Sequence, residues 1–471
     1  MNPLTKFWSL AESQPDSLAL VSSSVSMNYR DLADNVARFA GALRKRGITK
    51  GQVVAIDLQP ELEAVLILAC VQLGAVSLSA SPMILKGYQD QIDALITDQV
   101  LGSEQVQNRI VVDQSFMQEL GSVVKISTPE TLQGEDLVRL SFSSGTTGVP
   151  KGIPFTAARI PLRTESAHRN WMQAKPGMSL LGLDTITGII ALFWAVTSGN
   201  TFFASKSPQE NLELIKRHGI KAIETSPAKM KDLLDVAGNH EVTELKQILV
   251  AGSLMTDSLA KQCEQVFGFV PSYLYGSTEV GAATVGTFQS DSNNRLGKLV
   301  ADVDLEIVDE ALNSMEPNQV GQIRYRKSSM PDEYWNSASS HLNGFVDGWF
   351  YPGDLGSMNE EGYLFLRGRA KDMIIRGGVN IYPQEIEATL LAHPAVTDAA
   401  VVGWPSREFN EEVAAFVLLK SPVDPQNLTD WCREALASYK VPRQIFIEHT
   451  FPRTSLGKVI KAELSARLPA L

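Results

Sequence analysis

The segment QVVAIDLQPELEAVLILACVQLGAVSL, residues 52–78, decides the fold of the first half of the chain. Residues 52–57 form a short β-rich run, residues 61–73 have the pattern of a buried helix, and residues 76–78 form a second apolar run. A strand, a helix and a second strand in this order predict a βαβ unit, whose strands run parallel. We therefore expect an α/β domain built on a largely parallel sheet.

The alternation continues on both sides of this segment. Residues 29–46 have the apolar spacing of a helix, and a second series lies downstream, with helices expected at 211–218, 228–236 and 257–267 and strands at 222–224 and 247–250. After about residue 296 the pattern changes to shorter strands with turn signals, at 305–308, 321–325 and 363–366. These patterns predict stacked α/β layers followed by a small β-rich subdomain.

The last hundred residues have an α+β pattern of their own. Helices are expected at 383–392 and 424–438, and strands at 396–402, 412–419 and around Ile445. A chain of 471 residues exceeds the size of one core, so two or three domains are expected. We predict a large domain over residues 1–370 and a small, mobile C-terminal domain over residues 371–471.

Composition excludes several classes of protein. Hydrophobic residues make up 44% and charged residues 20% of the chain, as in ordinary globular enzymes. A net charge of −11 and a pI near 5.2 argue against a nucleic-acid partner, which requires clustered Lys and Arg. The three cysteines are widely separated and odd in number, which indicates inert core thiols in a reducing compartment.

No membrane or secretory segment is expected. The N-terminus lacks a basic region followed by an apolar one, so the sequence predicts a cytoplasmic protein. Two apolar stretches, residues 62–80 and 186–203, are interrupted by Glu63, Gln72 and Gly188 and are too short for a span of about 20 apolar residues. We interpret both as buried helix and strand segments.

A loop rich in small polar residues follows the strand-like run at 137–142. Glycines let the backbone approach an anion, and hydroxyl and ammonium groups supply hydrogen bonds and positive charge. The segment is therefore expected to bind phosphate through Ser143, Ser144, Gly145, Thr146, Thr147, Gly148 and Lys151. Because Pro150 precedes Lys151, it is not a P-loop, and the chain has no GxGxxG, HExxH or CxxC motif.

Five motifs in order resemble the adenylate-forming superfamily, which includes acyl- and aryl-CoA synthetases, adenylation domains of peptide synthetases and luciferases. They are SFSSGTTGVPKG (141–152), YGSTEVG (275–281), GWFYPGDLG (348–356), GRAKDMIIRGGVNIYPQEIE (368–387) and PRTSLGKVIK (452–461). The resemblance extends from about Ser26 to Ile460. It implies activation of a carboxylic acid by Mg·ATP to an acyl-AMP.

The resemblance also implies roles for individual residues. Glu279 would bind Mg²⁺ through a hard oxygen, and Thr278 would contact the α-phosphate. Tyr275 would stack beside the adenine, and Asp354 and Arg369 would hold the ribose hydroxyls. The remaining nucleotide-binding residues would be Gly252, Ser253, Gly276 and Ser277.

The C-terminal motifs imply a second step. Lys458 would bridge the carboxylate and phosphate oxygens during adenylation, and Lys371 would be the hinge about which the small domain then rotates. Gly377 and Gly378 would line the tunnel for a pantetheine thiol, where a Cβ would obstruct the path. The NIYP sequence after these glycines favours CoA as the acceptor. The alternative is a freestanding enzyme that loads an acid or amino acid onto a carrier-protein phosphopantetheine.

The acid would bind near Trp171, Asp184 and Gly188, by the family's layout. Many acyl-CoA ligases have histidine where this chain has Asp184, and amino-acid-activating relatives use aspartate to bind the substrate's ammonium group. A buried, unpaired carboxylate would be costly or protonated, so we expect Asp184 to have a partner. This residue leads to the hypothesis that the acid carries an amino group. A luciferase-like oxygenase and a non-catalytic nucleotide-binding relative are further alternatives.

Overall fold

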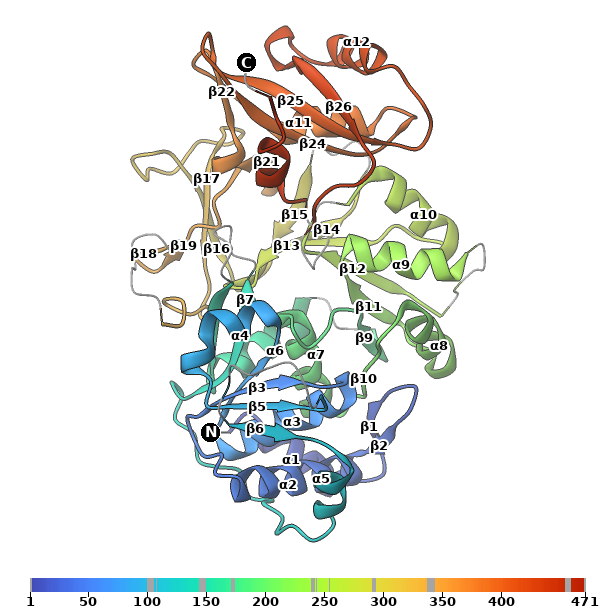
Figure 1. Ribbon diagram of the computed structural model, residues 1–471, viewed down its shortest axis with the longest axis vertical. Coiled ribbons are helices and arrows are strands. Elements are labelled where there is room, and N and C mark those ends of the chain that lie inside the picture. Colours follow the sequence, from blue (N-terminus) through green and yellow to red (C-terminus); the bar gives the residue numbers. More distant parts are fainter. Residues whose placement is uncertain are drawn as a thin grey trace.

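The computed structural model describes residues 2–99, 106, 108–143, 150–170, 174–238, 242, 244–253, 255–289, 294–336, 344–453 and 459–469. It has an α/β fold with a large N-terminal part and a smaller C-terminal part, as the sequence predicts. In Figure 1 the N-terminal elements lie at the bottom, the C-terminal elements at the top, and the strands of the largest sheet between them.

The βαβ unit predicted from residues 52–78 lies at the centre of a six-stranded sheet. Its strand order is β6-β5-β3-β4-β7-β8, in which all neighbours except β7 and β8 are parallel. Helix α3 begins at Pro60 and is ended by Gly74, which has φ 70°, and nearly all of its residues are buried. The elements are β3 (Val53–Asp57), α3 (Pro60–Leu73), β4 (Val76–Ser79), β5 (Ala94–Thr97), β6 (Arg109–Val111), β7 (Leu137–Ser143) and β8 (Lys151–Thr156).

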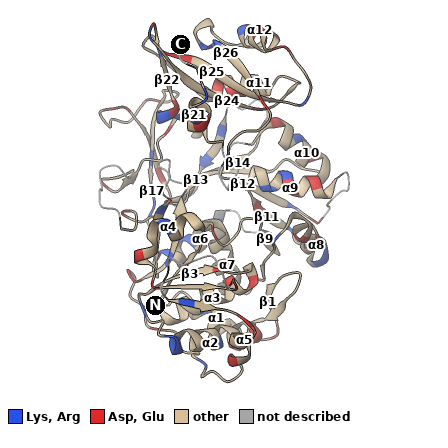
Figure 2. Cartoon of the chain, viewed as in Figure 1, with Lys and Arg blue, Asp and Glu red and all other residues tan. Residues whose placement is uncertain are grey.

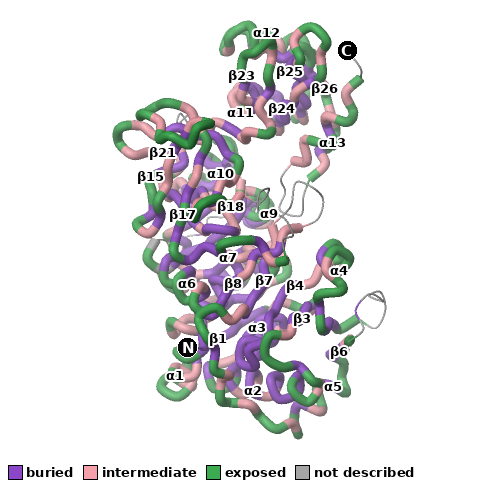
Figure 3. Tube along the Cα trace, turned by 90° about the vertical axis from the view of Figure 1, so that its left-hand side faces the viewer, coloured by how far each residue is buried: buried purple, intermediate pink, exposed green. Residues whose placement is uncertain are grey.

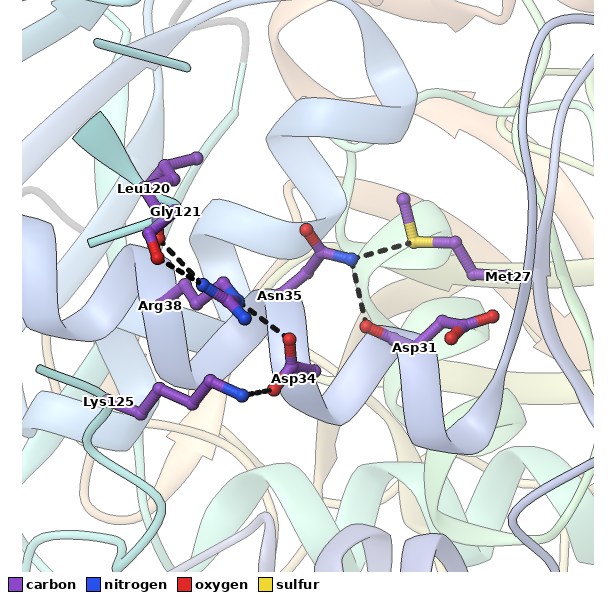
Figure 4. A network of polar contacts seen from close by, with 8 residues as sticks. All are labelled: Met27, Asp31, Asp34, Asn35, Arg38, Leu120, Gly121 and Lys125. Carbon is purple, nitrogen blue, oxygen red and sulfur yellow. Dashed lines mark hydrogen bonds and ion pairs between the residues drawn. The ribbon is translucent and has the colours of Figure 1, made fainter. Parts of the chain in front are cut away.

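Helix α2 (Tyr29–Lys45) packs against α3 and is fastened to the chain that leads into β7. Arg38 donates to the carbonyl oxygens of Leu120 and Gly121 at 2.9 and 3.3 Å, and Asp34 accepts from Lys125 (Figure 4). These contacts hold α2 against residues 120–125 of the chain. The same layer contains α1 (Thr5–Ser13), α4 (Pro82–Tyr88) and α5 (Gln114–Glu119).

The second α/β series and the β-rich segment share one twelve-stranded sheet. Strands β9, β11, β12 and β13 are parallel, and the sheet continues through antiparallel strands to β18. The strands are β9 (Gly177–Ser179), β11 (Ala222–Thr225), β12 (Gln247–Ala251), β13 (Ser272–Ser277), β14 (Gly281–Thr287), β15 (Arg295–Leu299), β16 (Asp304–Val308), β17 (Gly321–Arg326), β18 (Phe345–Val346), β19 (Trp349–Phe350), β20 (Asp354–Met358) and β21 (Tyr363–Arg369).

Local capping explains the helices that connect these strands. The side chains of Ser207, Ser226 and Thr256 each accept a backbone N–H in the first turn of the helix that follows. Gly219 and Gly268 end two of the helices in left-handed conformation, which glycine adopts without strain. The helices are α6 (Arg159–Asn170), α7 (Ile186–Thr197), α8 (Pro208–His218), α9 (Pro227–Ala237) and α10 (Asp257–Phe267).

A three-stranded sheet joins the N-terminus to the second layer. Strand β1 (Leu18–Val21) pairs with β2 (Ser26–Asn28) and, in parallel, with β10 (Phe202–Phe203), which follows α7. The two apolar stretches at 62–80 and 186–203 are therefore buried helix–strand segments, as predicted. Within the described residues, every helix is too short or too polar to cross a lipid bilayer.

The C-terminal part is built on a five-stranded sheet of β22 to β26, and its predicted helices and strands are confirmed. Its elements are β22 (Ile374–Arg376), β23 (Val379–Ile381), α11 (Pro383–Leu391), β24 (Val396–Ser406), β25 (Asn410–Leu419), α12 (Pro425–Ala435), β26 (Gln444–Glu448) and α13 (Lys461–Ser465). Strands β24 and β25 form a long antiparallel hairpin, and β26 adds to β25 in parallel.

The buried apolar residues divide at the end of β21. The main cluster ends at Leu364, with Leu366 packed against it, whereas two further clusters contain only residues from Ile374 onward. Figure 3 shows these interiors in purple in the large and the small part. Charged residues of both signs are interspersed over the helices in Figure 2. The three cysteines are buried and unpaired, as predicted.

One ionic cluster stabilises the small part, and it should be sensitive to pH. Glu412 is buried. Arg376 Nε lies 2.6 Å and Arg443 Nη1 lies 3.2 Å from its carboxylate oxygens. Burial acts to raise the pKa of Glu412, but the hydrogen bonds and charges of the two arginines outweigh it and hold the pKa below its ordinary value. The ion pairs therefore stabilise the fold at neutral pH, and the effect is lost as the pH falls through the lowered pKa.

Glu412→Gln should reduce the free energy of unfolding by about 3 kcal/mol at pH 7, because it leaves two arginines without their anion. The difference from wild type should shrink as the pH falls below about 4.5. Urea unfolding followed by tryptophan fluorescence at pH 7 and pH 3.5 measures both values. Glu434→Gln, which changes an exposed carboxylate, is the control. A difference that grows at low pH would contradict this assignment.

Candidate active site

The base of the predicted phosphate loop is a hairpin between β7 and β8, in which Ser143 and Lys151 are paired. The flanking chain is fixed by Tyr88, whose hydroxyl donates to the Pro150 carbonyl oxygen at 2.7 Å, and by the amide of Trp335, which donates to the Gly152 carbonyl oxygen at 2.8 Å. The predicted strand before the loop is confirmed. The centre of the loop and two other predicted site residues lie outside the described residues: Ser144, Gly145, Thr146, Thr147, Gly148, Trp171 and Lys458.

Glu279 lies in the turn between β13 and β14, and its side chain is buried. Tyr334 donates its hydroxyl to Glu279 Oε1 at 2.7 Å, and Lys151 Nζ lies 4.8 Å from the centre of the Tyr334 ring. Burial and the neighbouring Glu279 charge raise the pKa of Tyr334, so its phenol stays protonated and donates. One aromatic ring therefore brings the lysine of the phosphate loop and the expected metal ligand together.

Arg163 on α6 supports this turn and was not predicted from the sequence. Its guanidinium donates to the carbonyl oxygens of Glu279, Thr278 and Ser329. Burial lowers the pKa of Arg163 to about 10, and the Glu279 charge opposes this shift. Gly281 has φ 88°, and a Cβ there would stand 2.5 Å from Arg163 Nη1, so glycine is required at this position.

A second buried cation fastens α6 to the large sheet. Lys327 Nζ donates to Ser166 Oγ at 2.8 Å and lies 3.0 Å from Asp302 Oδ1. Burial lowers the pKa of Lys327, and Asp302 counteracts this effect. Because the partners of both cations are more than 20 residues away in the chain, no local pattern in the sequence indicates either contact.

Tyr275 and Asp354, which come from different motifs, meet in the interior. The Tyr275 hydroxyl donates to Asp354 Oδ2 at 2.7 Å, and Arg369 Nε lies 3.0 Å from Asp354 Oδ1. Asp354 and Arg369 are direct partners in the antiparallel pair β20–β21. Burial and the nearby charges of Tyr325 and Asp354 raise the pKa of Tyr275 far above its ordinary value, so the phenol remains a donor. Tyr275 and Arg369 thus each contact one oxygen of the Asp354 carboxylate.

The other predicted nucleotide-binding residues follow β12 or lie on β13. Gly252 has φ 94°, and the Ser253 carbonyl oxygen accepts the Tyr273 hydroxyl at 3.1 Å. At Gly276 the chain of β14 approaches so closely that a Cβ would collide with the backbone of Gly281. Ser277 Oγ accepts the Val280 amide at 3.2 Å. These contacts place the ends of β12 and β13 beside the Glu279 turn.

Asp184 is exposed, so the reasoning that a buried carboxylate here needs a partner does not apply. The residue lies in the turn before α7, where Thr185 caps the helix by accepting the Gly188 amide at 3.1 Å. Gly188 is in the first turn, and a Cβ there would collide with the backbone of Gly182. The two acid-binding candidates that the structure describes therefore lie close together, Asp184 in the turn before α7 and Gly188 in the first turn of that helix.

The C-terminal candidates lie at and beyond the junction between the two parts. Lys371 is exposed in the short 3₁₀ turn Ala370–Asp372 that separates β21 from β22. Gly377 and Gly378 connect β22 and β23, with φ 56° and 84°, values that a two-residue hairpin turn requires. Among the described residues, none apart from its two chain neighbours lies within 4 Å of a Cβ built on Gly378. The glycine pair is therefore needed here by the turn itself.

The described residues of the site include carboxylates of the kind that Mg·ATP binding uses. Among the described residues no group of three or more His, Cys, Asp and Glu side chains could enclose a metal. Mg²⁺ usually takes one or two protein carboxylates together with substrate phosphates, and Glu279 beside the phosphate loop offers such a carboxylate. Asp354 offers an acceptor for hydroxyl groups. The fold and this arrangement define an adenylate-forming enzyme.

Comparison with known proteins identifies the family. The AMP-binding enzyme family model matches residues 7–335, and the AMP-binding enzyme C-terminal domain matches residues 385–458. The chain therefore belongs to the AMP-binding enzyme family.

Individual relatives agree in length and fold. The 2-succinylbenzoate–CoA ligase of Bacillus subtilis is 29% identical, with 96% of each chain covered. The structure of o-succinylbenzoate CoA synthetase from Bacillus subtilis with its acyl-adenylate intermediate superposes with a TM-score of 0.86 at 28% identity, covering 98% of this chain and 97% of the other. The medium-chain fatty-acid–CoA ligase of Escherichia coli is 28% identical, with 97% of this chain and 89% of the relative covered.

These comparisons confirm the predicted class of enzyme and its cofactors. The chain is an AMP-forming acid–thiol ligase that uses ATP and Mg²⁺ to activate a carboxylic acid and then forms a thioester with CoA.

Proposed function

We propose that the acid activated by this enzyme is an aromatic carboxylic acid of the 2-succinylbenzoate type. The support is the relatives of that name, which match this chain over nearly its whole length. An amino-bearing acid is the second candidate, because the exposed Asp184 carboxylate before α7 could bind an ammonium group.

The single observation that carries the proposed site is the meeting of Lys151, Tyr334 and Glu279 beside the phosphate loop. In adenylation a carboxylate oxygen attacks the α-phosphorus of ATP and pyrophosphate leaves. Lys151 and Lys458 would supply positive charge toward the phosphate oxygens, and Glu279 would offer a carboxylate ligand to Mg²⁺. Tyr334 fixes the direction of the Glu279 carboxylate, so the metal ligand is preorganised.

The ribose is assigned to Asp354. This carboxylate is held between Tyr275 and Arg369, so its position is set before ATP binds. Asp354→Asn should raise the KM for ATP about tenfold, because one charged acceptor is lost, and leave the KM for the acid nearly unchanged. Steady-state pyrophosphate release with varied ATP measures this change. Asp347→Asn, in the exposed turn between β18 and β19, is the matched control. Equal KM values for ATP in both variants would remove the assignment.

Domain rotation is part of the proposal. The boundary at residues 370–371 is supported by the separate buried clusters and by the exposed Lys371 between them. After adenylation the small domain turns about this link, withdraws Lys458 and brings the Gly377–Gly378 turn to the site, where the CoA thiolate attacks the acyl carbon and AMP leaves. We also place the enzyme in the cytoplasm, where its unpaired cysteines stay reduced.

The decisive experiment is pyrophosphate release from Mg·ATP across aryl, fatty and amino acids, with and without CoA, followed by mass analysis of the products. Release and acyl-CoA formation with 2-succinylbenzoate or a related aryl acid would support the proposal. Selective turnover of an amino-bearing acid would support the second candidate. An adenylate that reacts with a carrier-protein phosphopantetheine would add that acceptor.

A further inference from the structure

A buried arginine lies at the contact between the two α/β layers, outside the proposed ATP site. Arg139 on β7 is 1% exposed. Its Nη2 donates to Ser79 Oγ at 2.6 Å and to the Leu183 carbonyl oxygen at 2.7 Å. Ser79 ends β4 and donates to Glu63 Oε1 on α3. Three elements of the first layer are therefore linked, through Arg139, to one backbone carbonyl of the second.

That carbonyl belongs to the peptide that precedes Asp184. Ser79 Oγ lies 3.0 Å from the same oxygen, but its single proton is donated to Glu63, so Arg139 is the group that holds the Leu183 oxygen and Ser79 holds Arg139 in place. A peptide unit is planar, and fixing its oxygen fixes the plane from which the next Cα departs. Arg139, held by Ser79, thus fixes the orientation of the peptide plane from which Asp184 departs.

The stability of the fold does not explain why a buried arginine occupies position 139. Among the described residues, Arg139 Nε and Nη1 are buried without a hydrogen-bond partner. Unsatisfied buried donors destabilise a fold, and well-packed apolar side chains usually replace buried charges at no loss of stability. A charged group here is better explained by a function that requires the Leu183 carbonyl to be held in one orientation.

We propose that Arg139, Ser79 and Glu63 form a positioning relay that orients the Leu183–Asp184 peptide and so determines how tightly and selectively the enzyme binds its acid. None of the three contacts the substrate in this proposal, which rests on binding of the acid near Asp184, as the sequence predicts and as the second candidate under the proposed function requires. Because β7 continues into the phosphate loop, the relay also connects the strand that carries that loop to the loop that binds the acid.

Ser79→Ala removes the centre of the relay. The KM for the acid should rise about tenfold, while the KM for ATP should change by no more than about twofold. Ser77→Ala is the matched control, since Ser77 is buried on the same face of β4 and its hydroxyl faces the Val138 carbonyl instead. Ser79→Thr keeps the hydroxyl and should restore the KM for the acid. Equal effects of Ser79→Ala and Ser77→Ala, or an equal rise in both KM values, would overturn the proposal.

A double-mutant cycle tests whether the relay acts through Asp184. Ser79→Ala should raise the KM for the acid much less in an Asp184→Asn background than in wild type. A full additional effect would show that the relay does not act through Asp184.

Hydrogen exchange provides a test that does not depend on turnover. Amides of residues 181–185 should exchange about tenfold faster in Ser79→Ala than in wild type, and at the wild-type rate in Ser77→Ala. Unchanged exchange in Ser79→Ala would overturn the relay. If wild type turns over none of the acids tested, the proposed substrate class fails while this measurement still decides whether the relay orders the loop.

Discussion

Lys458→Ala should lower the rate of acyl-AMP formation about a thousandfold. In the proposed mechanism this lysine supplies the positive charge between two anions, the attacking carboxylate and the α-phosphate, and losing such a group removes several kcal/mol of transition-state stabilisation. Single-turnover measurement of acyl-AMP in the absence of CoA isolates this step. The substrate affinities measured by binding should change little.

The second half-reaction provides an internal comparison for this variant. Chemically prepared acyl-AMP should still react with CoA at a rate near that of wild type, because Lys458 is withdrawn by then in the rotated conformation. Lys461→Ala is the matched control. It removes a nearby lysine whose Nζ is paired with Glu387 at 2.6 Å, and it should retain adenylation. Unchanged pyrophosphate release in Lys458→Ala would defeat the assignment.

Glu279→Gln should lower kcat/KM for pyrophosphate release about a hundredfold, through the loss of a charged metal ligand. The change preserves shape, and Tyr334 can still donate to the amide oxygen, so the fold should remain intact. Titration of Mg²⁺ at fixed ATP should show a raised requirement for the metal. The Tyr334 contact makes this variant a cleaner test than alanine, which would leave a buried hydroxyl without its partner.

Glu333→Gln is the control for this experiment. Glu333 is exposed and precedes Tyr334, so its substitution makes the same change in net charge close to the site without removing a group of the site. If both variants lose activity equally, the effect arises from the change in charge and not from a ligand at position 279. If neither loses activity, the metal assignment is wrong.

Elements with local signals were predicted closely from the sequence. Helix α10 has the predicted limits because Thr256 caps its start and Gly268 ends it, and both signals lie within the helix's own neighbourhood. The parallel strands β3 and β4 could be predicted because a buried helix of suitable length connects them. Such features depend on residues a few positions apart, where the pattern is directly visible.

The contacts that shape the site could not be predicted in this way. Arg163 supports the Glu279 turn across 116 residues of sequence, and Tyr334 reaches Glu279 across 55. Neither residue belongs to one of the five motifs. A buried arginine in a polar helix has the same local sequence pattern as an exposed one, so the pattern around Arg163 does not reveal its role. The exposure of Asp184 likewise depends on how two separate layers meet. The motif residues were found in sequence, whereas the groups that hold them in place required the structure.

The strand order of the large sheet affects how the chain can fold while it is being synthesised. Strand β21 lies between β15 and β20, although residues 300–362 separate β15 from β21 in the chain. As the polypeptide leaves the ribosome at about 5–20 residues per second, β16 to β20 emerge before the strand that joins them to β15. For several seconds the edge of β15 is unpaired, which makes this nascent chain a candidate client for chaperones that shield open β-edges.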